Sequence, residues 1–312
     1  MRRLLLALVL ALTGTALAPA PSTAGPGAGE AALAGAVKQA TLEVKRQPRV
    51  IGVARYTHTL VAAPGRYRAK PSKIRYQWLR ADDPIAGATG RRYAIQPRDV
   101  GARLRVQVTV LAPGYDPLEL VTKPTATVRH RVDVRRTVRY HVETRGRITT
   151  SLKQFRSQAQ QTYEDPRGWR AAGIRFVPVA HGGSLTLVLS QASLVPSFSS
   201  SCSAMWSCRV GRFVIINQDR WKNASPAWNA AHLPLRDYRH MVVNHETGHW
   251  LGLHHARCPG KGRLAPVMMQ QSKGLQGCRF NPWPTSHEIS SRTPRAKVMA
   301  ALYAAGYAPD VE

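Results

Sequence analysis

The sequence predicts two folded domains of different class, a small all-β sandwich over residues 46–128 and an α+β domain over residues 134–312. The sandwich is predicted by short runs of alternating apolar and polar residues that Pro, Gly and Asp turns separate. The α+β domain is predicted by the order of its segments, in which a strand, a helix and further strands precede a long helix. A chain of 312 residues is long enough for each domain to bury its own core.

The first 45 residues are predicted to lie outside both domains. Arg2 and Arg3 precede the apolar stretch 4–12, and small residues at 22–24 precede Gly25, which is typical of a secretory signal peptide over residues 1–24. A membrane anchor is the alternative, but the apolar run is short for a span and breaks at residues 13–15. Residues 25–45, rich in Gly, Ala and Pro, are predicted to be a linker. We therefore expect a secreted or cell-wall-associated, extracellular protein with no stable membrane anchor.

The sandwich is predicted from five strand-like segments, at residues 60–62, 74–79, 93–95, 104–110 and 118–121. This region resembles the immunoglobulin-like modules of bacterial surface and secreted proteins. The sequences that carry the resemblance are Tyr76-Gln77-Trp78-Leu79-Arg80, Ile85-Ala86-Gly87-Ala88-Thr89, Tyr93, and Asp99-Val100-Gly101 before Leu104-Arg105-Val106. The resemblance implies that Trp78 is the core tryptophan of a sandwich without a cysteine pair. It implies spacing, adhesion or substrate positioning, and no catalytic chemistry.

The α+β domain is predicted to contain four strands and three helices. The strand-like segments lie at residues 138–142, 174–179, 185–189 and 212–216. The helices are expected at residues 148–163, 235–251 and 293–303.

The predicted helix at 235–251 contains the sequence His245-Glu246-Thr247-Gly248-His249. Two histidines four positions apart project from one face of a helix, so both rings can reach a single Zn²⁺ at roughly 2.0 to 2.1 Å. Glu246 lies beside the first ligand, where its carboxylate can take a proton from a water that the zinc activates. His245 and His249 are therefore predicted zinc ligands, and Glu246 is the predicted general base.

The sequence continues with Gly252 and His255, which completes the pattern H-E-x-x-H-x-x-G-x-x-H and resembles the metzincin zinc peptidases. Gly252 suits the left-handed backbone of an abrupt helix end. His255 then supplies a third nitrogen, and His254 is the alternative, one residue short of the pattern. Three protein ligands leave one position open, which is typical of a catalytic zinc.

Metzincins also have a methionine turn beneath the zinc, and the run Pro266-Val267-Met268-Met269-Gln270 follows the third histidine here. Met268 resembles the turn methionine, and Met269 is the alternative. Two methionines in a loop are also consistent with a simple packing patch.

A longer stretch resembles an uncharacterised family of secreted actinobacterial zinc-protease-like domains, over about residues 134–290. The segments that carry this resemblance lie at residues 206–212, 217–221, 235–241, 258–260, 270–273 and 281–284. The resemblance implies a secreted zinc metalloendopeptidase that hydrolyses peptide bonds in a protein or peptide substrate. Ala256 follows His255, whereas several well-described metzincin groups have an acidic residue there, so the specificities of those groups do not transfer.

The four cysteines all lie in the C-terminal half, and an even number in an exported chain predicts two disulfides. Proximity in the sequence favours the pairs Cys202–Cys208 and Cys258–Cys278. A structural zinc site is the alternative, but the short spacing typical of such sites is absent.

The formal net charge of +28, from 45 basic and 17 acidic residues, predicts an attraction to polyanions. An anionic cell-wall polymer is one candidate partner, and a solvated basic surface without a partner is the alternative. No zinc-finger, RNP or helix-turn-helix signature indicates a specific nucleic acid.

Two other functions compete with protein hydrolysis. The chain could be a cell-surface or wall-binding protein with an inactive zinc site, but a structural site has no need of a carboxylate beside its ligand. It could also be an amidase of wall peptides, which fits the positive charge although nothing in the motif selects it.

Overall fold

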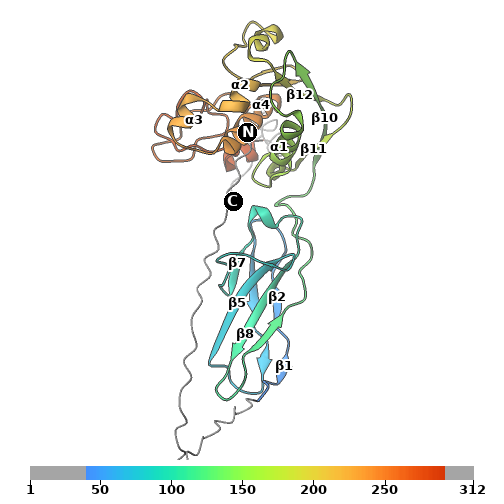
Figure 1. Cartoon of the computed structure of the whole chain (residues 1–312), viewed down its shortest axis with the longest axis vertical. Coiled ribbons are helices and arrows are strands. Elements are labelled where there is room, and N and C mark those ends of the chain that lie inside the picture. Colours follow the sequence, from blue (N-terminus) through green and yellow to red (C-terminus); the bar gives the residue numbers. More distant parts are fainter. Residues whose placement is uncertain (1–39, 292–312) are drawn as a thin grey trace, which may run out of the picture. The chain divides into compact units, whose positions relative to one another are not determined.

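The computed structural model describes residues 40–291 (Figure 1). The predicted signal peptide, most of the predicted linker and the predicted helix at 293–303 lie outside the described residues. None of the helices in the described range combines the length and the hydrophobicity that a bilayer crossing requires.

The N-terminal part of the described chain consists of antiparallel strands. Three strands form one sheet in the order β2-β3-β7, four form a second in the order β6-β5-β8-β9, and β1 pairs with β4. The strand bounds are β1 Val44–Arg46, β2 Arg49–Ile51, β3 Thr59–Ala63, β4 Arg66–Tyr67, β5 Lys73–Arg80, β6 Asp83–Pro84, β7 Arg92–Ala94, β8 Leu104–Leu111 and β9 Leu118–Val121.

Side chains from both larger sheets share one hydrophobic core. Every second residue of β8 is buried in it, as the two-residue period of a strand requires. Trp78 is fully buried, stacks on Tyr93 at 5.3 Å between ring centroids, and donates a hydrogen bond to the Gly90 carbonyl. Leu42 also lies in this core, so the folded part begins before residue 46, inside the predicted linker.

The C-terminal part is built on a five-stranded mixed sheet in the order β11-β10-β12-β14-β13. Its strands are β10 Arg136–Arg145, β11 Ile174–Pro178, β12 Leu185–Ser190, β13 Cys208–Val210 and β14 Phe213–Asn217. All neighbours are parallel except the edge strand β13, which is antiparallel to β14. Several sheets with few helices are consistent with the predicted α+β class.

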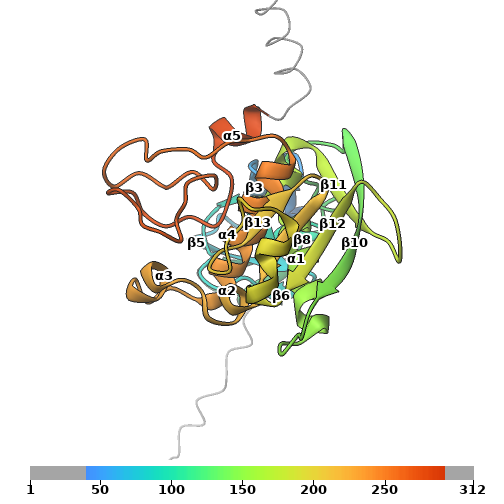
Figure 2. The same cartoon turned by 90° about the horizontal axis from the view of Figure 1, so that it is seen from above.

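The helices of this part are α1 Leu152–Glu164, α2 Gln218–Asn223, α3 Pro226–Ala230, α4 Leu235–Trp250 and α5 Ser286–Ser290. It also contains the 3-10 turns η2 Trp169–Ala172 and η3 Ala192–Phe198, whereas η1 Pro97–Asp99 lies in the N-terminal part. Helices α1 and α4 pack together on one face of the sheet (Figure 2). The alternation of β12 explains this arrangement: Leu185 and Leu187 pack towards these helices, whereas Val188 packs towards η3 on the other face.

The predicted helix at 148–163 and the predicted strand at 212–216 both begin later in the structure, each for a local reason. Helix α1 begins at Leu152 and not at residue 148, because Ser151 has an extended backbone and its hydroxyl caps the helix by accepting from the Gln154 N–H. Arg212 lies in the tight turn after Gly211, since Val210 pairs directly with Phe213. The short edge strand β13 was not predicted, nor were the short strands β1, β2, β4 and β6 and the short helices α2, α3 and α5.

Candidate metal centre

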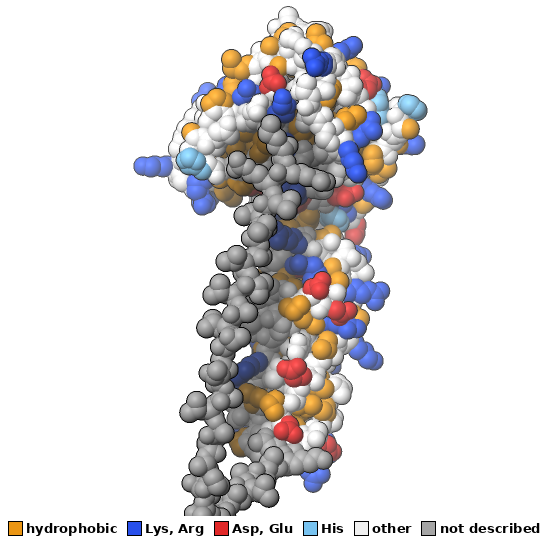
Figure 3. Space-filling model, in the orientation of Figure 1, with side chains coloured by type: hydrophobic (Ala, Val, Ile, Leu, Met, Phe, Trp, Pro, Cys, Tyr) orange, Lys and Arg blue, Asp and Glu red, His pale blue; other side chains and the backbone are white. Residues whose placement is uncertain are grey.

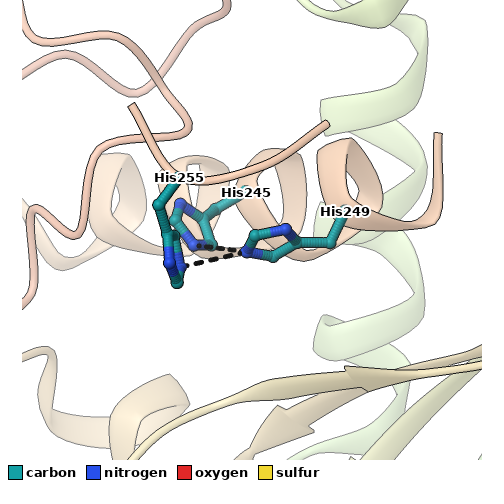
Figure 4. Close-up of side chains that lie close together, drawn as sticks. All are labelled: His245, His249 and His255. Carbon is teal, nitrogen blue, oxygen red and sulfur yellow. Dashed lines mark hydrogen bonds between the residues drawn. The ribbon is translucent and has the colours of Figure 1, made fainter. Parts of the chain in front are cut away.

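Three histidine rings converge at the C-terminal end of α4 (Figure 4). The Nε2 atom of His249 lies 3.2 Å from Nε2 of His245 and 3.2 Å from Nε2 of His255. Ligands bound tetrahedrally at 2.0 to 2.1 Å lie about 3.3 Å apart. These two distances fit tetrahedral ligation, and all three ligand nitrogens lie within 4.8 Å of one another, so the cluster can hold one metal ion.

In two of the three rings, Nδ1 donates a hydrogen bond to a backbone carbonyl, which leaves Nε2 without a proton and available to a metal ion. Nδ1 of His245 donates to the Val267 carbonyl at 2.7 Å, and Nδ1 of His249 donates to the Leu253 carbonyl at 2.9 Å. Burial lowers the pKa of His245 to about 3 and also lowers the pKa of His249 and of His255. The rings are therefore neutral, and each Nε2 lone pair is available to a cation.

The end of α4 brings the third histidine back to the first two. Gly252 has a φ of +89°, and the Leu253 N–H donates to the Gly248 carbonyl, so the chain reverses directly after the helix. This reversal places His255 with His245 and His249, whereas the exposed His254 is not part of the cluster.

Glu246 lies beside the cluster without a structural partner. Its side chain is 6% exposed, and no described residue donates a hydrogen bond to its carboxylate. Burial raises the pKa of Glu246 to about 8, and the positive charge of Arg209 opposes that effect. A buried carboxylate that no structural hydrogen bond uses is a candidate acid or base.

Met268 packs beneath the histidines against the backbone of α4. It is almost fully buried, and a Cβ added at Gly248 would lie 2.2 Å from its sulfur and 3.0 Å from the Trp169 ring. Met269 instead packs with Ala265 in a separate small cluster. Of the two methionines, Met268 therefore occupies the position under the site.

We expect Gly248→Ala to lower the free energy of unfolding by about 1–3 kcal/mol, because the added methyl group would overlap Met268. In an exposed helix the same change would stabilise by roughly 1 kcal/mol. Urea unfolding measures the sign. The loss should shrink in a Met268→Ala background, and a stabilised Gly248→Ala variant would contradict the close contact.

Residues 116–282 match the family described as "Protein of unknown function (DUF3152)". This match covers more than half of the chain. The chain belongs to this family. The matched range contains the three histidines, Glu246 and Met268. No curated protein matches the chain.

The family region encloses a cavity of about 520 Å³ in front of the histidines. Helix α4 lines it through Tyr238, Met241 and Val242, and the loop that the Cys202–Cys208 disulfide closes lines another side. Segment 270–273 lines it as well. The second disulfide, Cys258–Cys278, spans the chain segment that holds Met268. Both predicted pairings are thus present, and no cysteine is free.

No sequence pattern identified two charged residues near the site, Arg209 at the cavity wall and Glu288 behind the Met268 turn. Arg209 lies on the unpredicted strand β13 and donates from Nη2 to the His249 carbonyl at 2.8 Å. Glu288 is buried at the start of α5 and accepts hydrogen bonds from Val267 and Met268. The sequence Thr285-Ser286-His287-Glu288 is a recognisable capping box, but it indicates only the helix start.

Proposed function

We propose that the chain is a secreted zinc-dependent metalloendopeptidase. The observation that carries the proposal is the convergence of three neutral imidazoles beside the partner-free carboxylate of Glu246, inside a cavity. A structural site would not need that carboxylate. Two disulfides support an oxidising, extracellular location.

His245, His249 and His255 would hold the ion and leave its remaining position open to the cavity. A zinc ion there would lower the pKa of a water molecule and polarise the scissile carbonyl. Glu246 would accept a proton from that water as its oxygen attacks the carbonyl carbon. The same carboxyl group would then donate the proton to the departing amine as the C–N bond breaks.

The edge strand β13 supports an extended peptide as the substrate. Within the described residues it pairs only with β14, and Cys208 and Arg209 of this strand line the cavity. An edge strand presents unpaired backbone groups with which another extended chain can pair. A peptide pairing there would pass in front of the histidines.

The finer fold assignments are part of the proposal. A mixed sheet covered by α1 and α4, a glycine-ended site helix and Met268 beneath the histidines support a metzincin-like domain. Two antiparallel sheets around the buried Trp78 support an immunoglobulin-like module before it.

The test of the function is metal-dependent cleavage of a mixed peptide library by the purified mature chain. We expect a chelator to abolish the cleavage and added zinc to restore it, because no other described cluster of residues offers a comparable ligand set. The products should carry new amino termini within the peptides, as an endopeptidase generates. Cleavage that survives complete metal removal would reject the proposal.

A further inference from the structure

Three basic side chains lie around the histidine cluster on adjoining hollows of the surface. Arg209 and Lys273 line the cavity of about 520 Å³. Lys273 also lines a neighbouring hollow of about 450 Å³, together with Arg257. His255 belongs to both hollows, so the two adjoin at the site.

Only one acidic residue lies among these basic side chains within the described range. Glu246 is the one acidic residue that lines either hollow. Arg209, Arg257 and Lys273 are exposed, and none of them forms an ion pair within the described range. The bond from Arg209 to the His249 carbonyl holds one of the three at the cavity wall.

The charge of the whole chain acts in the same direction. Lysine and arginine side chains are scattered over the face drawn in Figure 3, and the formal net charge is +28. Clefts lined by one sign of charge concentrate ligands of the opposite sign. The net charge would repel a cationic peptide and attract an anionic one.

We propose that the site takes acidic peptides, with Asp or Glu side chains on the residues that flank the scissile bond. The inference rests on the proposed peptidase function and adds the substrate class to it. Lys273 and Arg257 would contact carboxylates on the His255 side, and Arg209 would contact them on the side of β13.

The test measures peptide binding and therefore does not depend on hydrolysis. The experiment uses two labelled peptides that differ only in carrying Glu or Lys on both sides of the same central bond. The affinity of each peptide is measured for the zinc-loaded full chain that carries Glu246→Gln. We expect about tenfold tighter binding of the acidic peptide at low salt, with the difference shrinking as salt rises. Equal affinities, or no binding of either peptide, would overturn the inference.

Charge-reversal variants separate the local charges from the charge of the whole chain. The double variant Arg257→Glu with Lys273→Glu should abolish or reverse the preference for the acidic peptide. The control double variant Lys153→Glu with Arg175→Glu changes the net charge by the same amount at exposed positions that line neither hollow, and it should keep the preference. An equal loss in both double variants would assign the preference to overall charge and overturn the inference. Cleavage of both peptides by the wild-type chain at equal rates would support the peptidase function and reject only the substrate class.

A second inference comes from the hydrogen bonds of Glu288, whose side chain is 4% exposed. Its Oε1 accepts from the Met268 N–H at 2.8 Å, and its Oε2 accepts from the Val267 N–H at 3.1 Å and from the N–H and hydroxyl of Thr285. No cation of the described chain pairs with it. The peptide group between Val267 and Met268 also accepts from Nδ1 of His245 at 2.7 Å.

One peptide group thus joins a buried carboxylate to a ligand ring. Its N–H donates to Glu288, and its carbonyl accepts from His245. Hydrogen bonds in such a chain polarise one another, and an acceptor behind a ligand histidine fixes the tautomer and makes the ring more basic. We infer that Glu288 is a positioning residue that acts on His245 through this peptide group.

The test compares Glu288→Gln with Glu288→Asp. Zinc affinity, measured by competition with a chelator, should fall about 10- to 100-fold in Glu288→Gln and less in Glu288→Asp, which keeps the charge. In the metal-free chain the NMR resonance of the His245 Nδ1 proton should move upfield in Glu288→Gln, because its hydrogen bond weakens. Unchanged affinity, or equal losses in both variants without a shift of that resonance, would overturn the inference. Should Glu288→Gln fail to fold, Glu288→Asp carries the test, because its shorter side chain weakens the hydrogen bonds from Val267 and Met268. A lower zinc affinity together with an upfield shift of the His245 Nδ1 resonance is then expected, and the absence of both changes would overturn the inference.

Discussion

Glu246→Gln is expected to keep the fold and the bound metal while reducing peptide hydrolysis by about 10² to 10⁴-fold, the usual contribution of a general base. Glutamine has the size of glutamate but cannot accept a proton from the attacking water. The histidine cluster does not include Glu246, so the ligand set stays intact. Glutamine is neutral, and no described residue donates a hydrogen bond to Glu246, so no loss of stability is expected.

The measurement compares wild type and Glu246→Gln on one peptide library at equal zinc content. Glu164→Gln is a matched control, because it makes the same substitution at an exposed position of α1 outside the cavity and should leave hydrolysis unchanged. Equal cleavage by wild type and Glu246→Gln would show that the activity belongs to another site.

His249→Ala is expected to remove the metal. His249 is the ring whose Nε2 lies 3.2 Å from the Nε2 atoms of both other ligands, and alanine is well tolerated in a helix. Loss of a direct ligand should exceed the roughly 10- to 100-fold loss of affinity that removing an outer partner causes. Elemental analysis of the purified variant should find far less than one zinc per chain, and hydrolysis should disappear with it.

The chain provides a matched control for this change. His254 is the neighbour of His255 but is exposed and outside the cluster. His254→Ala should keep both metal and activity. A variant His249→Ala that holds its zinc fully, or a His254→Ala variant that loses it, would reject the ligand assignment.

Much of the candidate site could be predicted from the sequence because its signals are local. The four-residue spacing of His245 and His249 lies within one helix, whose period is fixed. Gly252 marks the helix end by its conformational freedom, and its positive φ agrees with that interpretation. Nine strands of the described chain were also predicted within a few residues, since alternation of apolar side chains is a local pattern, whereas β1, β2, β4, β6 and β13, of two or three residues each, were not predicted.

Only the tertiary structure showed which of two adjacent candidate residues belongs to the site. His254 and His255 are chemically equivalent, and the path of the chain after Gly252 determines which ring meets the other two. Met268 and Met269 differ in the same way, because only Met268 faces Gly248. Two adjacent residues of a loop can pack in different clusters, and no pattern in the local sequence predicts which of them lies under the site.

No sequence pattern predicted the two charged residues near the site, Arg209 and Glu288. Arg209 reaches α4 from a three-residue edge strand, and Glu288 reaches the Met268 turn from a helix cap about twenty residues later in the chain. The sequence by itself determined the helix, the ligand spacing and the general base, because helical geometry relates residues a few positions apart. The partners of those residues are brought together by packing between segments, and packing depends on the whole folded chain.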